Sequence, residues 1–247
     1  MFTHTINPTI LNLGPLEIRW YGLMYVLGFI ITYYYVRAAI RAGKIKLTEK
    51  ELDNLLGILV VALIVGARLF EVIFYEPAYY LNEPWKIFYI WQGGLSFHGG
   101  LVGLAIVGYW YARKKKIPFL KLVDVFIVPL AIGNALGRIG NFINAELYGV
   151  PTNLPWGVVF PGIEGARHPT QLYEAAYNII IFITLFSLRN KKLKDGTLFG
   201  IFLIMYGIFR IAVEFLKDMP HYGPLTTGQY LTIPVFLLGV WLVWRNV

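Results

Sequence analysis

The chain contains no cysteine and few charged residues. Without cysteine, none of its 247 residues can supply a disulfide, a thiolate nucleophile or a thiolate metal ligand. Only 15% of the residues are charged, whereas 57% are hydrophobic and the mean hydropathy is +0.59. A soluble domain carries about 25% charged residues and cannot bury this much apolar surface. The composition therefore predicts a polytopic membrane protein.

Motifs of metal, cofactor and hydrolase chemistry are also missing. The histidines at positions 4, 98, 168 and 221 lack ligand spacing, and no His-Glu-x-x-His, Gly-x-Ser-x-Gly or phosphate-binding glycine motif occurs. We therefore expect no metal and no cofactor. The net charge of +8 comes from basic residues in short runs between apolar segments. That placement indicates membrane topology and contact with anionic lipids, so we expect no nucleic-acid partner.

Apolar stretches predict an all-α fold with about seven transmembrane helices in one domain, 1–247. An aromatic-rich segment, 76–93, is too mixed to cross and suits an outer helix lying in the membrane interface. Glycine, proline and asparagine are frequent in 143–170, which predicts an irregular outer loop or small cap. The expected spans are 18–37, 54–75, 94–112, 122–142, 171–188, 197–216 and 228–246.

Basic residues predict the orientation of these spans. Most of the 22 lysines and arginines follow the first, third, fifth and seventh spans. By the positive-inside rule, the N-terminus is outside and the C-terminus is cytoplasmic. The first residues lack a basic region and a short apolar core, so we expect no cleavable signal peptide. The basic runs lie within 37–50, 113–121 and 189–194 and at 245.

Polar residues gather at one depth of the predicted bundle. The block Gly137–Val150 places Arg138, Asn141 and Glu146 at the end of a long apolar helix. At about 1.5 Å of rise per residue, other spans bring ionisable groups to the same outer third of the membrane. Charge inside a bilayer is costly and usually marks a functional site. The residues sharing this depth are Tyr21, Arg68, Glu71, His98, Arg138, Asn141, Arg210 and Glu214.

Each of these residues also has a structural interpretation. Arg68 and Glu71, three residues apart, suit an intrahelical ion pair that serves packing. Arg210 and Glu214 have similar spacing, but a second arginine at their level favours function. His98, between glycine pairs, is either a packing residue or a proton acceptor.

Two arginines at the level of the lipid headgroups suit a phosphate, because a guanidinium offers a planar fork of donors to phosphate oxygens. Arg138 could instead extend its side chain to the interface, although the polar residues that follow it favour a site. His168 precedes Pro169, and the pair is explained by a helix start with Pro169 at the first helical position.

Five segments resemble the bacterial prolipoprotein diacylglyceryl transferase family, in the family's order along the chain. The block Gly137–Gly149 is similar to that family's signature. The other four are Arg19–Tyr25, Gly94–Leu101, His168–Glu174 and Tyr206–Phe215. The resemblance implies transfer of the diacylglyceryl group from phosphatidylglycerol to the lipobox cysteine of an exported prolipoprotein, with a thioether and glycerol phosphate as products.

The same resemblance assigns roles to individual residues. Arg138 and Arg210 correspond to essential arginines that hold the lipid phosphate. His98, Tyr21, Asn141 and Gly149 match positions tied to activity, Asn141 and Gly149 on the phosphatidylglycerol side, and His98 is the expected proton acceptor. Glu146 and Glu214 lie beside them in their motifs and are also candidates. The implied partners are phosphatidylglycerol, other membrane lipids, and the prolipoprotein signal peptide with its lipobox cysteine.

The expected location is the bacterial cytoplasmic (inner) membrane, with the site toward the outer leaflet. Two other classes of protein stay open. A non-catalytic carrier or scramblase of anionic lipid would use the arginines as escorts, although the chain lacks the inverted repeats common among transporters. A receptor-like seven-helix protein would not require two arginines at phosphate level.

Overall fold

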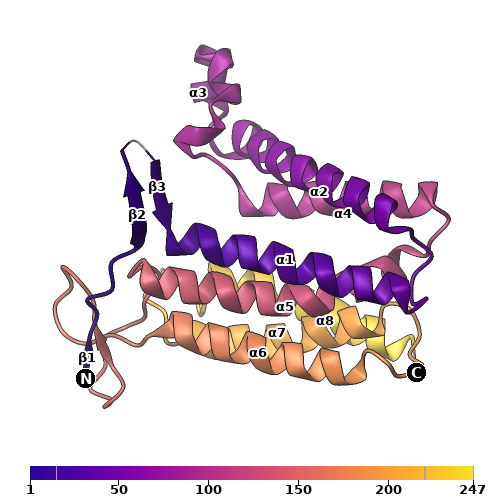
Figure 1. Cartoon of the computed structure of the whole chain (residues 1–247). Coiled ribbons are helices and arrows are strands. Elements are labelled where there is room, and N and C mark those ends of the chain that lie inside the picture. The colour runs from indigo at the N-terminus through magenta and orange to yellow at the C-terminus, as the bar shows by residue number, and fades with distance from the viewer. Residues whose placement is uncertain (15, 220, 247) are drawn as a thin grey trace. The chain divides into compact units, whose positions relative to one another are not determined.

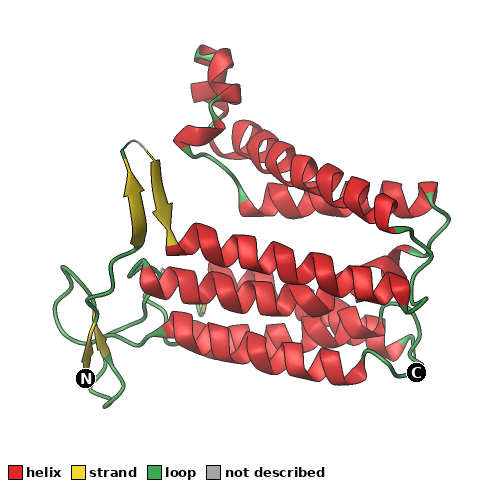
Figure 2. Ribbon diagram, viewed as in Figure 1, coloured by secondary structure: helices red, strands yellow, loops and turns green. Residues whose placement is uncertain are grey.

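A computed structural model describes residues 1–14, 16–219 and 221–246. Seven of the helices in these ranges have 18 or more residues, and they coincide with the seven predicted spans (Figures 1 and 2). They are α1 (Trp20–Arg41), α2 (Glu49–Phe70), α4 (Phe97–Lys114), α5 (Phe119–Ile143), α6 (Thr170–Leu188), α7 (Thr197–Glu214) and α8 (Thr227–Trp244).

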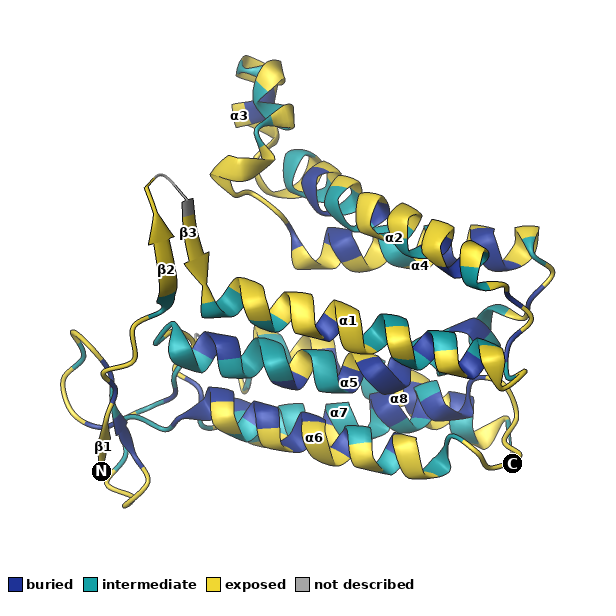
Figure 3. Ribbon diagram, viewed as in Figure 1, coloured by how far each residue is buried: buried dark blue, intermediate teal, exposed yellow. Residues whose placement is uncertain are grey.

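The helices confirm an all-α, multi-pass membrane protein. Within the described residues, six helices are long and apolar enough to cross a membrane. The exception is α4, which carries four glycines and ends in Arg113 and Lys114, so the crossing of 94–112 stays a prediction. Large apolar side chains such as Phe29, Ile106 and Ile183 are exposed, and Figure 3 shows exposed positions recurring along the helices. Such surfaces are typical of helices that face lipid.

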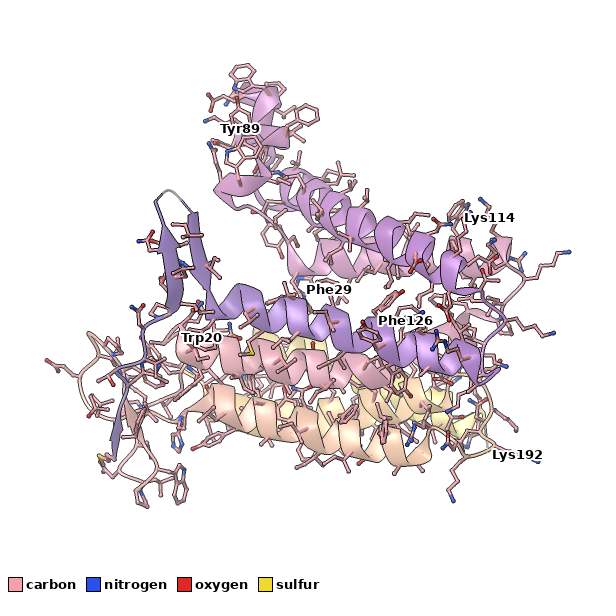
Figure 4. All side chains as sticks on the ribbon, viewed as in Figure 1. Trp20, Phe29, Tyr89, Lys114, Phe126 and Lys192 are labelled. Carbon is pink, nitrogen blue, oxygen red and sulfur yellow. The ribbon has the colours of Figure 1, made fainter. Side chains whose placement is uncertain are left out.

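The chain forms two compact units, each described by itself. The larger unit, Met1–Val36 with Val123–Val247, contains most of α1 and α5 and the whole of helices α6 to α8. In this unit α1 approaches α5 closely where Gly28 meets Gly133, and α7 packs on α8 through Gly200, Gly207 and Gly239. Trp20 and Lys192 lie at opposite ends of the unit (Figure 4).

The smaller unit, Arg37–Leu122, is built on α2 and α4. These helices pack closely because Gly66 faces Gly99 and Gly103, and a Cβ at any of the three would strike the opposite backbone. Helix α2 continues into a π-helical turn, Glu71–Tyr75. The predicted interfacial segment forms short pieces rather than one helix: α3 (Pro77–Asn82) and 3-10 turns at Pro84–Phe88 and Ile90–Gln92. Prolines at the starts of the first two pieces favour separate starts.

Short strands, which the sequence analysis did not predict, complete the larger unit. An antiparallel hairpin precedes α1, so this helix begins at Trp20 rather than at residue 18. The loop 144–169 pairs with the N-terminal residues in a two-stranded parallel sheet. The strands are β1 (Phe2–Thr3), β2 (Thr9–Leu13), β3 (Leu16–Arg19), β4 (Val158–Val159), β5 (His221–Tyr222) and β6 (Leu225–Thr226).

Candidate active site

The buried carboxylate of Glu174, in the first turns of α6, contacts three cationic side chains. Its Oε2 atom lies 2.5 Å from Nε of Arg138. Its Oε1 atom lies 2.8 Å from Nη1 of Arg210 and 2.6 Å from Nζ of Lys217. The Glu174 side chain is 1% exposed. A buried carboxylate is strongly destabilising unless it is paired, so these contacts explain how it is kept.

Arg138 and Arg210 keep donors that these contacts do not use. Arg138 points Nε at Glu174 and donates from Nη1 to Oδ1 of Asn141 at 3.4 Å. Arg210 uses Nη1 for Glu174 and for Glu214. The Nη2 group of each arginine takes part in none of these contacts, and the side chains are 27% and 16% exposed. Each guanidinium can therefore still donate to an anion from outside the cluster.

Glu214 ties Arg210 to the start of α8. Its Oε2 atom lies 2.8 Å from Nη1 of Arg210, and its Oε1 accepts a hydrogen bond from the Thr226 hydroxyl at 2.8 Å. Gly228, in the first turn of α8, has no room for a Cβ because the Glu214 carboxylate occupies that space. A helix N-terminus favours a carboxylate, so the start of α8 helps to stabilise this buried charge.

Asn141 connects Arg138 to Glu146, in the turn that follows α5. The Asn141 amide donates to Oε1 of Glu146 at 2.8 Å. Tyr21 of α1 packs against Gly140, and its hydroxyl lies near Asn141 and Glu146. Its hydroxyl forms a hydrogen bond with the Tyr25 hydroxyl at 2.9 Å.

The turn around Glu146 is strained. Ala145 and Leu147 both have positive φ, 56° and 60°, which costs non-glycine residues about 1–3 kcal/mol each. The start of α6 holds the turn: Gln171 donates to the Glu146 carbonyl at 2.5 Å, and Thr170 donates to the Leu147 carbonyl at 2.9 Å. Strain that is held in this way fixes the Glu146 side chain beside Asn141.

Gly149 joins this turn to the segment that carries Lys217. It forms an antiparallel bridge with Lys217, and the next residue, Val150, donates its N–H to the Leu216 carbonyl at 2.9 Å. A Cβ at Gly149 would collide with that carbonyl and with side-chain atoms of Thr170 and His168. Only glycine fits here, so we expect any substitution at position 149 to disturb the packing of this turn.

Comparison with known proteins identifies the family. The chain matches the prolipoprotein diacylglyceryl transferase family over residues 8–245. It is 44% identical to a phosphatidylglycerol–prolipoprotein diacylglyceryl transferase of Geobacter sulfurreducens, with 97% of this chain and 94% of the relative covered. The chain belongs to the prolipoprotein diacylglyceryl transferase family. Identically named proteins of Desulfotalea psychrophila (44% identical; 97% and 93% covered) and Nitratidesulfovibrio vulgaris (42%; 98% and 94%) agree.

Most of the site residues that the sequence predicts in the larger unit lie close together. Contacts join Arg138, Asn141, Glu146, Arg210 and Glu214, directly or through Glu174, and Tyr21 lies beside them. The ion pair of Arg210 with Glu214 is confirmed. Arg138 is held by Glu174 rather than extended freely to the interface. The sequence predicts Pro169 to be the first helical residue, but α6 begins at Thr170 and Pro169 is its N-cap.

Sequence reasoning missed Glu174 and Lys217. Glu174 is the last residue of the family-like segment His168–Glu174, and Lys217 follows the segment Tyr206–Phe215 by two residues. A usable signal was the imbalance of charge, because two intramembrane arginines required buried counter-charges. The sequence analysis predicts such a counter-charge only for Arg210, in Glu214.

The remaining candidates belong to the smaller unit. Arg68 does not pair with Glu71 as the spacing suggested. Instead, it donates to the Tyr80 hydroxyl at 2.7 Å and to the carbonyls of Gly93 and Gly94, each at 2.9 Å. It also donates to the carbonyls of Ile87 and Lys86. Arg68 therefore has a structural role, as one interpretation predicted, but with different partners: it ties the segment 80–94 to α2.

His98 is exposed in the first turn of α4, and the Ser96 side chain accepts the Gly99 N–H at the start of that helix. The His98 ring makes an edge-on contact with the ring of Phe97. The imidazole is therefore accessible from outside the α2–α4 pair. Its role as a proton acceptor stays a prediction.

Proposed function

We propose that this chain transfers the diacylglyceryl group of phosphatidylglycerol to the lipobox cysteine of a prolipoprotein. This reaction is the first step of lipoprotein maturation. The cysteine sulfur attacks the glyceryl carbon bonded to the phosphate oxygen. A carbon–sulfur bond forms, the carbon–oxygen bond breaks, and glycerol phosphate leaves with the bonding electrons. The nucleophile comes from the substrate, which is compatible with a chain that has no cysteine.

The paired arginines carry this proposal. Cleavage of the carbon–oxygen bond builds negative charge on the departing phosphate, and fixed cations that face this charge stabilise the transition state. Glu174 holds Arg138 and Arg210 on one carboxylate while each keeps an Nη2 group outside the ion pairs. Because their geometry is set before substrate arrives, the two guanidiniums pay little reorganisation cost when the charge develops.

The other candidates support these two arginines or the thiol. Asn141 orients Arg138 and, with Gly149, belongs to the phosphatidylglycerol side of the site. Tyr21, Glu146 and Glu214 complete its polar wall. His98 accepts the thiol proton, since a cysteine reacts as its thiolate and imidazole is the side chain that most often accepts a proton in catalysis.

The proposed location is the bacterial inner membrane, with the N-terminus outside, the C-terminus cytoplasmic and the site toward the outer leaflet. The basic runs after the odd-numbered predicted spans support this orientation. A C-terminal tag should be protected from protease in right-side-out vesicles. Cleavage of the tag in intact vesicles would contradict the orientation.

The test uses purified protein, phosphatidylglycerol labelled in its acyl chains, and a lipobox peptide with one cysteine. We expect a base-stable, thioether-linked label on that cysteine, dependent on both arginines. A peptide with serine in place of cysteine is the control for the site of attachment.

An unlabelled peptide, together with phosphatidylglycerol binding that depends on the arginines, would support the lipid carrier and reject the transferase. Label transfer that survives Arg138→Lys and Arg210→Lys would keep the transferase but reject the phosphate site.

A further inference from the structure

Lys217 is the least accessible cation of the ion-pair network, which we define as Arg138, Glu174, Arg210, Glu214 and Lys217. Its side chain is 3% exposed, compared with 27% for Arg138 and 16% for Arg210. At this burial the ammonium contacts Glu174 and does not reach a lipid bound outside the cluster. A role for Lys217 in the reaction must therefore act through its charge.

The network contains three cations and two carboxylates. In the ionised state it carries one net positive charge. Without Lys217, the two carboxylates would balance Arg138 and Arg210, and the network would be neutral. A phosphate diester approaching the arginines would then meet a weaker attraction, because each guanidinium is already offset by a carboxylate.

Burial makes this single charge effective. Water screens charges poorly inside a low-dielectric region, so a cation acts over several ångströms there. Burying a lysine is also costly, and a buried ion pair is often replaceable by apolar residues of similar volume without loss of stability. Packing alone therefore does not require an ammonium at this position.

The backbone around Lys217 is fixed by contacts that are independent of its charge. The bridge to Gly149 and the hydrogen bond from Val150 to Leu216 set its position. Gly149 allows this approach only because it lacks a Cβ. The Lys217 side chain thus enters the cluster from a segment that the turn after α5 holds in place.

We propose that Lys217 is a positioning residue that keeps the phosphate site positive without touching the substrate. The Lys217 ammonium compensates the negative charge of the Glu174 carboxylate. Glu174 can then align Arg138 and Arg210 without cancelling their attraction for phosphate. The inference rests on the proposed function, because it assumes that the two arginines receive the lipid phosphate.

Charge-balanced variants test this idea in the acyl-label assay, with the phosphatidylglycerol mole fraction in mixed micelles as the variable. Lys217→Met makes the network neutral, and Lys217→Arg keeps its charge. The double variant Lys217→Met/Glu174→Gln restores one net positive charge and removes a buried pair together. Lys192→Met, at the opposite end of the larger unit (Figure 4), removes the same charge from a distant site.

We expect Lys217→Met to raise KM for phosphatidylglycerol by about tenfold or more, with a smaller change in kcat. Lys217→Arg should stay close to wild type, and the double variant should recover most of the lost affinity. Lys192→Met should have no effect. Thermal unfolding in detergent identifies variants that are misfolded. If Lys217→Met is unstable, the double variant still tests the idea, because it leaves no unpaired carboxylate at position 174.

Two results would overturn the inference: an unchanged KM in folded Lys217→Met, or a double variant with KM no lower than that of Lys217→Met. Arg138→Lys and Arg210→Lys, measured in parallel, separate this failure from failure of the proposed function. If both arginine variants lose activity while Lys217→Met does not, the phosphate site stands and the charge-balance inference alone is wrong.

Discussion

Two carboxylates, Glu174 and Asp124, lie at opposite ends of the helices of the larger unit, and they are stabilised in different ways. Glu174 is surrounded by Arg138, Arg210 and Lys217. Asp124 of α5 instead accepts backbone N–H groups at the start of α7, from Gly196 at 2.7 Å and from Phe199 at 2.8 Å. Helix α7 lacks a side-chain cap of its own at Gly196, so Asp124 supplies that cap from a neighbouring helix.

In the proposed function, Asp124 is a structural carboxylate, whereas Glu174 lies at the phosphate site. Each carboxylate oxygen of Asp124 accepts one backbone N–H, and these contacts supply no cation with spare donors for a ligand. The arginines around Glu174 have more donors than the carboxylate uses, so that end of the unit can bind an anion. The proposed function therefore depends on the unused donors of the arginines around Glu174 and not on the burial of a carboxylate alone.

The largest effect is expected when the guanidinium fork is removed from the Glu174 end. Arg138→Lys should lower kcat/KM by about 100-fold or more, because a point charge cannot both hold Glu174 and donate to phosphate. The acyl-label assay measures this, with protein yield and thermal unfolding as controls. A fully active lysine variant would remove the distinction between the two carboxylates.

The variant His98→Gln tests whether lipid binding at the Glu174 end of the larger unit is independent of proton transfer. It should slow thiol alkylation by about 100-fold at neutral pH, the usual contribution of a general base, while phosphatidylglycerol binding persists. Single-turnover rates and lipid binding to purified protein measure the two steps. Unchanged turnover at neutral pH would exclude His98 as the proton acceptor.

Gly149→Ala tests how the Glu174 end depends on backbone packing. The added methyl group would collide with the Leu216 carbonyl, so we expect a loss of about 1–3 kcal/mol in stability. The displaced segment should also raise KM for phosphatidylglycerol, because it carries Lys217. Gly137→Ala is a matched control, since no atom lies within 4 Å of its added Cβ. Equal behaviour of the two variants would contradict the packing argument.

Asp124→Ala should affect stability rather than chemistry. Loss of the cap on α7 should cost about 1–2 kcal/mol, while the specific activity of the folded protein stays unchanged. Thermal unfolding and the label assay on the same preparation measure both quantities. A selective loss of activity in a fully stable Asp124→Ala protein would show that the two ends are coupled.

The smallest effect concerns alkaline pH. Burial lowers the pKa of Lys217 below that of an ordinary lysine, Arg210 and Arg138 lower it further, and Glu174 opposes the shift. Lys217 should therefore lose its proton as the pH rises toward the ordinary lysine range, and KM for phosphatidylglycerol should rise a few-fold. Lys217→Arg keeps its charge and should show a flatter KM profile. Parallel profiles for the two proteins would contradict this assignment.

The sequence by itself determined the class of the protein, the approximate helices and the polar level. Long apolar runs can only be satisfied as helices in a bilayer, so composition and periodicity were enough to locate them. The motifs carrying Arg138 and Arg210 identified the family. The hairpin before α1 escaped prediction, because its strands are short and merge with the apolar run that follows.

The tertiary structure decided which charges meet. Arg68 and Glu71 have the spacing of an ion pair, yet Arg68 turns to loop carbonyls that lie up to 26 residues along the chain. Glu174 contacts Arg138 on α5, Arg210 on α7 and Lys217 beyond α7, and no local pattern reports such pairings. Periodicity describes one helix at a time, whereas the balance of buried charge depends on how several helices pack together.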